Sequence, residues 1–74
     1  MSSPAEVPIR DDSIRLGQLL KLAGLVEDGA MARAVIEAGE VTVDGAVWSR
    51  RGQQVRPGML VSYAGETVRV VSGA

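Results

Sequence analysis

The stretch from Ala32 to Gly45 constrains the fold more than any other part of the sequence. Its first residues, up to Ile36, place apolar side chains at helical spacing. Gly39 suits the left-handed position that ends a helix, because it has no Cβ atom to clash there. Val41–Val43 then alternates apolar, polar, apolar, which is the period of a half-buried strand. Asp44-Gly45 predicts a tight hairpin turn, since both residues tolerate positive φ. A helix and a strand joined at this corner must share one core.

The length limits the number of domains. A chain of 74 residues makes one domain and buries only about 60% of the surface that its unfolded form exposes. We expect a flexible tail over residues 1–8, which hold two prolines and few apolar side chains, and a single domain over residues 9–74. Val7 and Ile9 leave a short edge strand open as an alternative at the end of that tail.

The remaining elements follow from the same patterns. Apolar residues at helical spacing predict a first helix from Leu16 that ends near Gly24, and Asp28 is a suitable N-cap for a second helix from Gly29 to about Ala38. Ser49–Arg56 is polar and predicts a loop or an irregular strand. Further strands are expected over residues 46–48, 59–63 and 67–71, with turns at 57–58 and 64–65. The predicted fold class is α+β, with two short helices packed on a small, mainly antiparallel sheet.

The position of Trp48 depends on the hairpin turn. A two-residue turn places Ala46 and Trp48 on the face that Val41 and Val43 share. A three-residue turn with a bulge places Val47 on that face and turns Trp48 outward. The pattern of residues alone leaves both arrangements open.

The composition argues against catalysis. The chain has no cysteine and no histidine, which excludes Cys/His metal sites, disulfides and the commonest general base. The acidic pairs Asp11-Asp12 and Glu27-Asp28 are typical of helix starts. No glycine pattern matches a phosphate-binding loop. We therefore predict no enzymatic activity, no cofactor, no metal and no small-molecule substrate.

Targeting signals are also missing from the sequence. No apolar run approaches the roughly 20 residues that span a bilayer, and the first residues lack the basic start and apolar block of a signal peptide. We expect a cytoplasmic protein with no membrane partner.

The charges divide unequally along the chain. The formal net charge is −1, but residues 1–40 carry −3 and residues 41–74 carry +2. Arg50-Arg51 lie beside Trp48, and arginine and exposed indole groups suit phosphates and unpaired bases. On spacing alone, a solvated loop next to a core tryptophan is the favoured explanation of the same residues, because arginine loops are ordinary protein surface. The low net charge and a free sheet edge also suit a small protein-interaction module, which is the alternative function.

The segments RLGQLLKLAGL, ARAVIEAGEVTVDGAV and VRPGMLV resemble the small RNA-binding domain named after ribosomal small-subunit protein four. Within that family the chain is most similar to the stand-alone YbcJ-like proteins. The resemblance runs from about Ile14 to Val71. It implies the alpha-L RNA-binding motif, in which the two helices and the following hairpin present the binding surface. It also implies a structured RNA partner, ribosomal or transfer RNA, in a ribosomal particle or beside another protein.

The resemblance assigns individual residues to RNA. Arg33 matches the basic position of the second helix, Lys21 the one late in the first helix, and Arg50 and Arg51 the basic pair after the hairpin. Relatives usually carry a polar residue at position 48, which favours the bulged turn and an exposed Trp48 able to stack on an unpaired base.

Two departures from the family pattern predict that this chain binds RNA more weakly than is usual in the family. Many members have Ser-Arg where this chain has Asp28-Gly29, so one basic side chain is missing. Gln53-Gln54 stand where relatives often have further basic residues.

Overall fold

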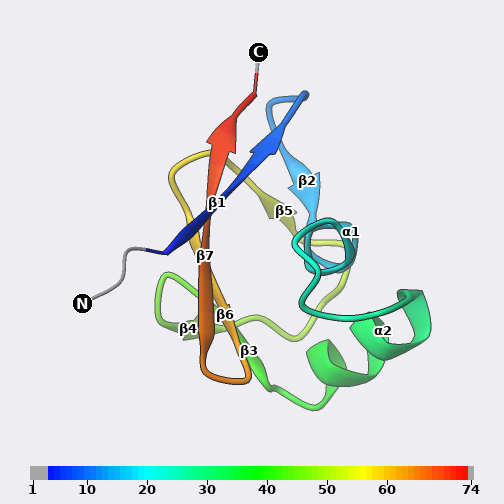
Figure 1. Cartoon of the computed structure of the whole chain (residues 1–74). Helices are drawn as coiled ribbons and strands as arrows, with labels where there is room; N and C mark the ends of the chain where they lie inside the picture. The colour runs from blue at the N-terminus through cyan, green and yellow to red at the C-terminus, as the bar shows by residue number, and fades with distance from the viewer. Residues whose placement is uncertain (1–3, 74) are drawn as a thin grey trace.

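The computed structural model describes residues 4–73. Two helices and seven strands follow one another in the order β1 Ala5–Ile9, β2 Ile14–Arg15, α1 Leu16–Leu22, α2 Gly29–Glu37, β3 Val41–Val43, β4 Ala46–Val47, β5 Gln54–Val55, β6 Leu60–Tyr63 and β7 Glu66–Ser72. Five strands form one sheet in the order β1-β7-β6-β3-β4, and β2 pairs with β5 in a second sheet. Figure 1 shows both helices on the same side of the larger sheet.

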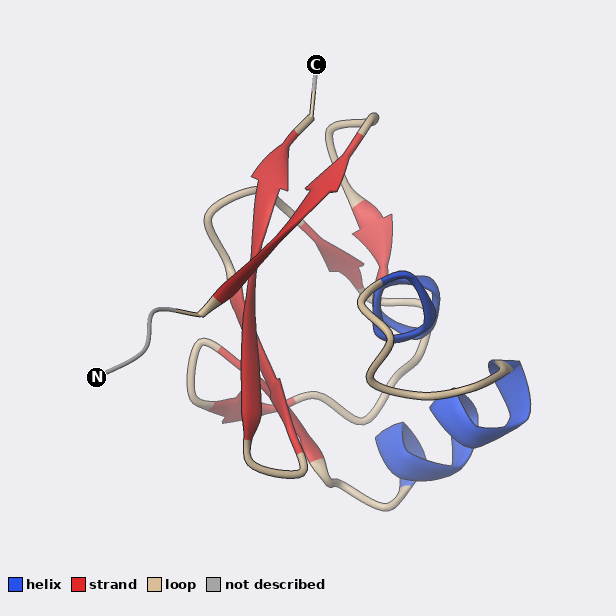
Figure 2. Cartoon of the chain, in the orientation of Figure 1, coloured by secondary structure: helices blue, strands red, loops and turns tan. Residues whose placement is uncertain are grey.

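The larger sheet is antiparallel except at one edge, where β1 runs parallel to β7. Valines of both sheets, three leucines of α1 and Ile36 of α2 form most of the core. Its largest fully buried side chains are those of Leu16, Leu19, Leu20, Ile36, Val41, Val43, Val55, Val61 and Val70. The α+β class predicted from the sequence is confirmed, with the helices and the sheet forming the two layers in Figure 2.

Both helices end where the sequence indicated. α1 is closed by Gly24, with φ of +74°, and α2 by Gly39, with φ of +76°. α2 begins at the predicted cap, because the Asp28 carboxylate accepts a hydrogen bond of 2.8 Å from the Met31 N–H. In the part of the chain that the structure describes, neither helix is long and apolar enough to cross a membrane.

The β3–β4 hairpin has a two-residue turn, so the bulged turn favoured by the resemblance is wrong. Val43 pairs directly with Ala46, and Asp44 and Gly45 both adopt positive φ, of 52° and 85°. These dihedrals complete a two-residue turn without an extra residue. Val47 is consequently 60% exposed rather than buried, while Trp48 is half-buried and packs against the core.

Two segments are more regular than the sequence suggested. The predicted flexible tail over residues 1–8 is wrong for residues 5–8, because these residues belong to β1. The pairing of β1 with β7 buries the side chains of Val7 and Ile9. Residues 1–3 lie outside the described residues. The polar stretch after Trp48 contains β5, whose Val55 is fully buried where it pairs with Ile14.

The left-handed conformation of Gly39 predicts a specific cost of substitution. A Cβ atom there would meet only Val47 Cγ1, at an ordinary 3.7 Å, so the penalty is conformational. Gly39→Ala should lower the free energy of unfolding by about 1–2 kcal/mol in urea denaturation. Gly29→Ala is the matched control, because Gly29 has no positive φ and open space around it. Equal effects of the two substitutions would contradict a conformational role for Gly39.

Candidate functional site

The start of α1 is capped by the loop between β4 and β5. The N-cap residue Arg15 makes no side-chain capping hydrogen bond. Instead the N–H groups of Leu16 and Gly17 donate to the carbonyl groups of Gln53 and Arg51, over 2.9 and 3.1 Å. These bonds satisfy two of the donors that a helix leaves free at its N-terminus. They also hold Arg51 beside α1.

Gly17 permits the close approach of this loop. A Cβ atom at Gly17 would lie 3.6 Å from Arg51 Cβ and 4.0 Å from Ile36 Cδ1. One carbon atom therefore fits, and a larger side chain would meet the loop on one side and α2 on the other.

A hollow of about 390 Å³ lies where α1, α2 and this loop meet, and four cationic side chains line it: Arg15, Lys21, Arg33 and Arg51. Small residues separate them, namely Gly17, Gly29, Ala32 and Gly52, and Gln18 completes the lining. We call it the cationic hollow. Its charged groups come from β2, α1, α2 and the loop, so only the folded chain brings them together.

The charge of the cationic hollow is opposed by few carboxylates. Among the described residues that line it, none is acidic. Arg33 pairs with Glu37 over 3.0 Å, and the two side chains are 58% and 57% exposed. This is the only ion pair found within residues 4–73, and such an exposed i,i+4 pair contributes only a few tenths of a kcal/mol. A stronger anion can therefore compete with Glu37 for Arg33.

The structure brings together three of the five residues singled out in the sequence. Lys21, Arg33 and Arg51 line the cationic hollow, whereas Arg50 and Trp48 are not among the described residues that line it. Sequence reasoning missed Arg15. The available signal was its spacing, because Arg15, Gln18 and Lys21 recur every three residues and so follow one side of α1.

The cationic hollow offers no chemistry beyond binding an anion. In the described part of the chain, no group of three or more acidic, histidine or cysteine side chains is placed to hold a metal ion. The donors present are guanidinium, ammonium and amide groups, which suit phosphate oxygens.

Comparison with known proteins gives the family. Residues 7–71 match the S4 domain family. The chain belongs to this family. YbcJ of Escherichia coli, which is named as an RNA-binding protein, is 46% identical to this chain over 59 residues. The alignment covers 80% of this chain and 84% of YbcJ. RlbA of Bacillus subtilis, which is named as a ribosome maturation protein, is 35% identical to this chain over 65 residues. The alignment covers 88% of this chain and 89% of RlbA.

A solved structure supports the same assignment. The solution structure of YbcJ from E. coli, with an alpha-L motif involved in RNA binding, superposes with a TM-score of 0.73 at 41% identity. The match covers 97% of this chain and 92% of that one. The resemblance to the family, and the prediction that the chain is not an enzyme, are in agreement with this S4 domain assignment.

The space at Gly17 predicts opposite effects of two substitutions. Gly17→Ala should raise the free energy of unfolding by about 0.5–1 kcal/mol, because alanine favours the helix and its Cβ fits. Gly17→Leu should lower it by about 1–3 kcal/mol and push the loop away. Urea denaturation measures both, and hydrogen exchange of the Leu16 and Gly17 amides reports the loop. If the hydrogen-exchange rates of these amides are unchanged in the Gly17→Leu variant, the loop does not pack against Gly17.

Proposed function

We propose that this protein binds structured RNA by seating backbone phosphates in the cationic hollow. The observation that carries the proposal is the convergence of Arg15, Lys21, Arg33 and Arg51 on one hollow in a chain whose net charge is −1. Folding has concentrated half of the basic side chains in one place, which a purely structural role does not require. The RNA-binding descriptions of YbcJ support the choice of ligand.

The geometry suits a folded RNA backbone. Guanidinium groups bind phosphate oxygens through two parallel hydrogen bonds, and Lys21 adds a point charge. The small residues between them let a backbone approach closely. If three or four phosphates are neutralised, a plot of the logarithm of the binding constant against the logarithm of the salt concentration should have a slope of roughly −2 to −4. Ribosomal and transfer RNA are the proposed partners, and the likeness to RlbA, named for ribosome maturation, supports a ribosomal particle. Such a partner implies action in the cytoplasm.

Arg50 and Trp48 have secondary roles in this proposal. Arg50 adds long-range attraction from the loop, and the exposed part of Trp48 stacks on an unpaired base next to the bound backbone. Arg33 binds phosphate after exchanging its weak partner Glu37 for a stronger anion.

Docking of a protein on the sheet edge has less support. One edge strand, β4, has only two residues and offers few free backbone groups to an added strand. The other edge strand, β1, contains Pro8, which has no backbone N–H to donate.

Replacing the two loop arginines separately tests the hollow. Arg51→Ala should weaken binding of a structured RNA roughly five- to tenfold and make the salt slope shallower by about one, because one phosphate contact is lost. Arg50→Ala should have a smaller effect, and the double variant should resemble Arg51→Ala. Fluorescence anisotropy at several salt concentrations measures all three. The thermal midpoint should stay nearly unchanged, because the loop is held by backbone hydrogen bonds.

Arg69→Ala is the matched control for these variants, since Arg69 is exposed on β7 and does not line the hollow. If Arg51→Ala binds like Arg69→Ala, the phosphate assignment is wrong.

A gain of affinity gives an independent test. Gly29 lines the cationic hollow and has open space where a side chain would project. Gly29→Arg introduces the basic residue that many members of the family carry there and should tighten RNA binding about two- to fivefold, by one added phosphate contact. Gly29→Gln adds a similar length without charge and is the control. Equal affinities of the Arg and Gln variants would contradict phosphate binding at this end of the hollow.

A further inference from the structure

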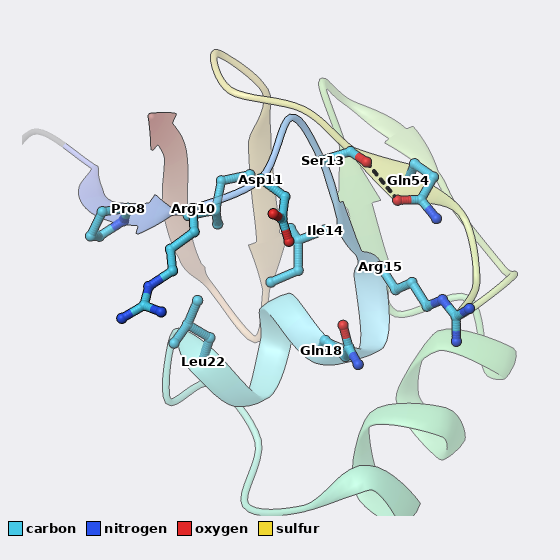
Figure 3. Close-up of a pocket in the computed structure, with 10 residues that line it drawn as sticks. Pro8, Arg10, Asp11, Ser13, Ile14, Arg15, Gln18, Leu22 and Gln54 are labelled. Carbon is cyan, nitrogen blue, oxygen red and sulfur yellow. Dashed lines mark hydrogen bonds between the residues drawn. The ribbon is translucent and has the colours of Figure 1, made fainter. Parts of the chain in front are cut away.

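A second hollow, of about 460 Å³, lies between α1 and the turn that joins β1 to β2. We call it the β1–β2 hollow, and Figure 3 shows its lining. Arg15 and Gln18 line both this hollow and the cationic hollow, so the two hollows are neighbours. Its volume is within the usual range for small-ligand sites, which is about 300–1,000 Å³.

The β1–β2 hollow has an apolar floor, unlike its neighbour. Leu22 lines it and is 57% exposed, although α1 directs its other leucines into the core. The half-buried Ile14 also lines the hollow. Apolar side chains suit the face of a nucleobase, which is apolar while its edge is polar.

The rim of the β1–β2 hollow is polar and partly fixed before any ligand binds. Gln18 and Gln54 contribute amide groups. The Ser13 hydroxyl donates to Gln54 Oε1 over 2.8 Å, which ties the β1–β2 turn to β5 (Figure 3). In the same view, Arg10 and Arg15 lie at opposite ends of the hollow. Two cations at the ends of one hollow match the two phosphates that flank one nucleotide.

Asp11 determines which ligand group the hollow can accept. Its side chain lies between those of Arg10 and Gln18 in Figure 3, and it has no ion-pair or hydrogen-bond partner within residues 4–73. A carboxylate repels phosphate and can only accept hydrogen bonds. The group that meets it must therefore be a donor. Guanine presents two adjacent donors on its Watson–Crick edge, N1–H and the 2-amino group, which match the two oxygens of a carboxylate.

We propose that the β1–β2 hollow holds an unpaired guanine of the RNA whose backbone occupies the cationic hollow. The guanine face packs on Leu22 and Ile14, its donor edge binds Asp11, and its flanking phosphates lie at Arg10 and Arg15. This inference rests on the proposed function. It assigns base recognition to a part of the surface outside the cationic hollow. It also gives the Asp11 carboxylate a function in binding RNA, because the carboxylate accepts hydrogen bonds from the base.

The test uses a short hairpin RNA with one unpaired nucleotide beside the stem, made with guanine, inosine or adenine at that position. The unmodified protein should bind the guanine probe about five- to tenfold more tightly than the adenine probe, with inosine between them, as expected for a bidentate contact. Asp11→Asn should bring the guanine-to-adenine ratio toward one. Asp12→Asn is the matched control, because it removes the same charge from the neighbouring exposed residue outside the hollow.

The outcomes separate this inference from the function on which it rests. If Asp11→Asn and Asp12→Asn both raise affinity equally for every probe, Asp11 is only a repulsive charge and the guanine site is wrong. Equal binding of the three probes by the unmodified protein overturns it as well. If Arg51→Ala weakens every probe while no probe is preferred, RNA binding stands and only the guanine site falls. If Arg51→Ala changes nothing, the proposed function itself fails.

Discussion

Two backbone hydrogen bonds, from the first N–H groups of α1 to the loop carbonyls of Gln53 and Arg51, join the fold to the site. α1 has seven residues and no side-chain cap. Isolated helices of that length are not stable in water. It persists because Leu16, Leu19 and Leu20 are buried and because the loop satisfies two of its free donors. The same bonds hold Arg51 next to Gly17, so the loop cannot leave the hollow without exposing the helix start. The backbone of the loop is therefore tied to a helix that packs on the core.

The sequence predicted the parts of the fold that local chemistry decides. The helix cap at Asp28, the helix end at Gly39 and the turn at Asp44-Gly45 each depend on the residues within a few positions. The pairing of β1 with β7 depends instead on residues far apart in the chain, and no local pattern distinguishes an edge strand from a tail. The hairpin shows a different kind of error. Likeness to relatives suggested a bulge, but the positive φ values of its two turn residues complete the shorter turn.

The candidate site was predictable only in part, because it depends on contacts between residues far apart in the chain. Lys21, Arg33 and Arg51 could be selected from the resemblance, because each occupies a basic position of the family pattern. Their convergence depends on how the helices and the loop pack. Arg15 was missed because the sequence does not show that the loop after Trp48 returns to the start of α1 and forms a hollow beside it. Neighbours in sequence can also separate in space, since Arg51 lines the hollow and Arg50 does not.

The net charge of −1 conceals this arrangement because several carboxylates have local structural partners. Asp28 accepts a hydrogen bond from Met31 at the start of α2, and Asp44 accepts one from the Leu60 N–H over 3.0 Å, which ties the β3–β4 turn to β6. Both carboxylates contribute to the formal sum, but neither lines the hollow. At physiological salt, charges more than about 8 Å apart are largely screened. Under the proposed function, an RNA at the surface responds mainly to the charges within that distance, so the four cations of the hollow matter more for its binding than the total charge does.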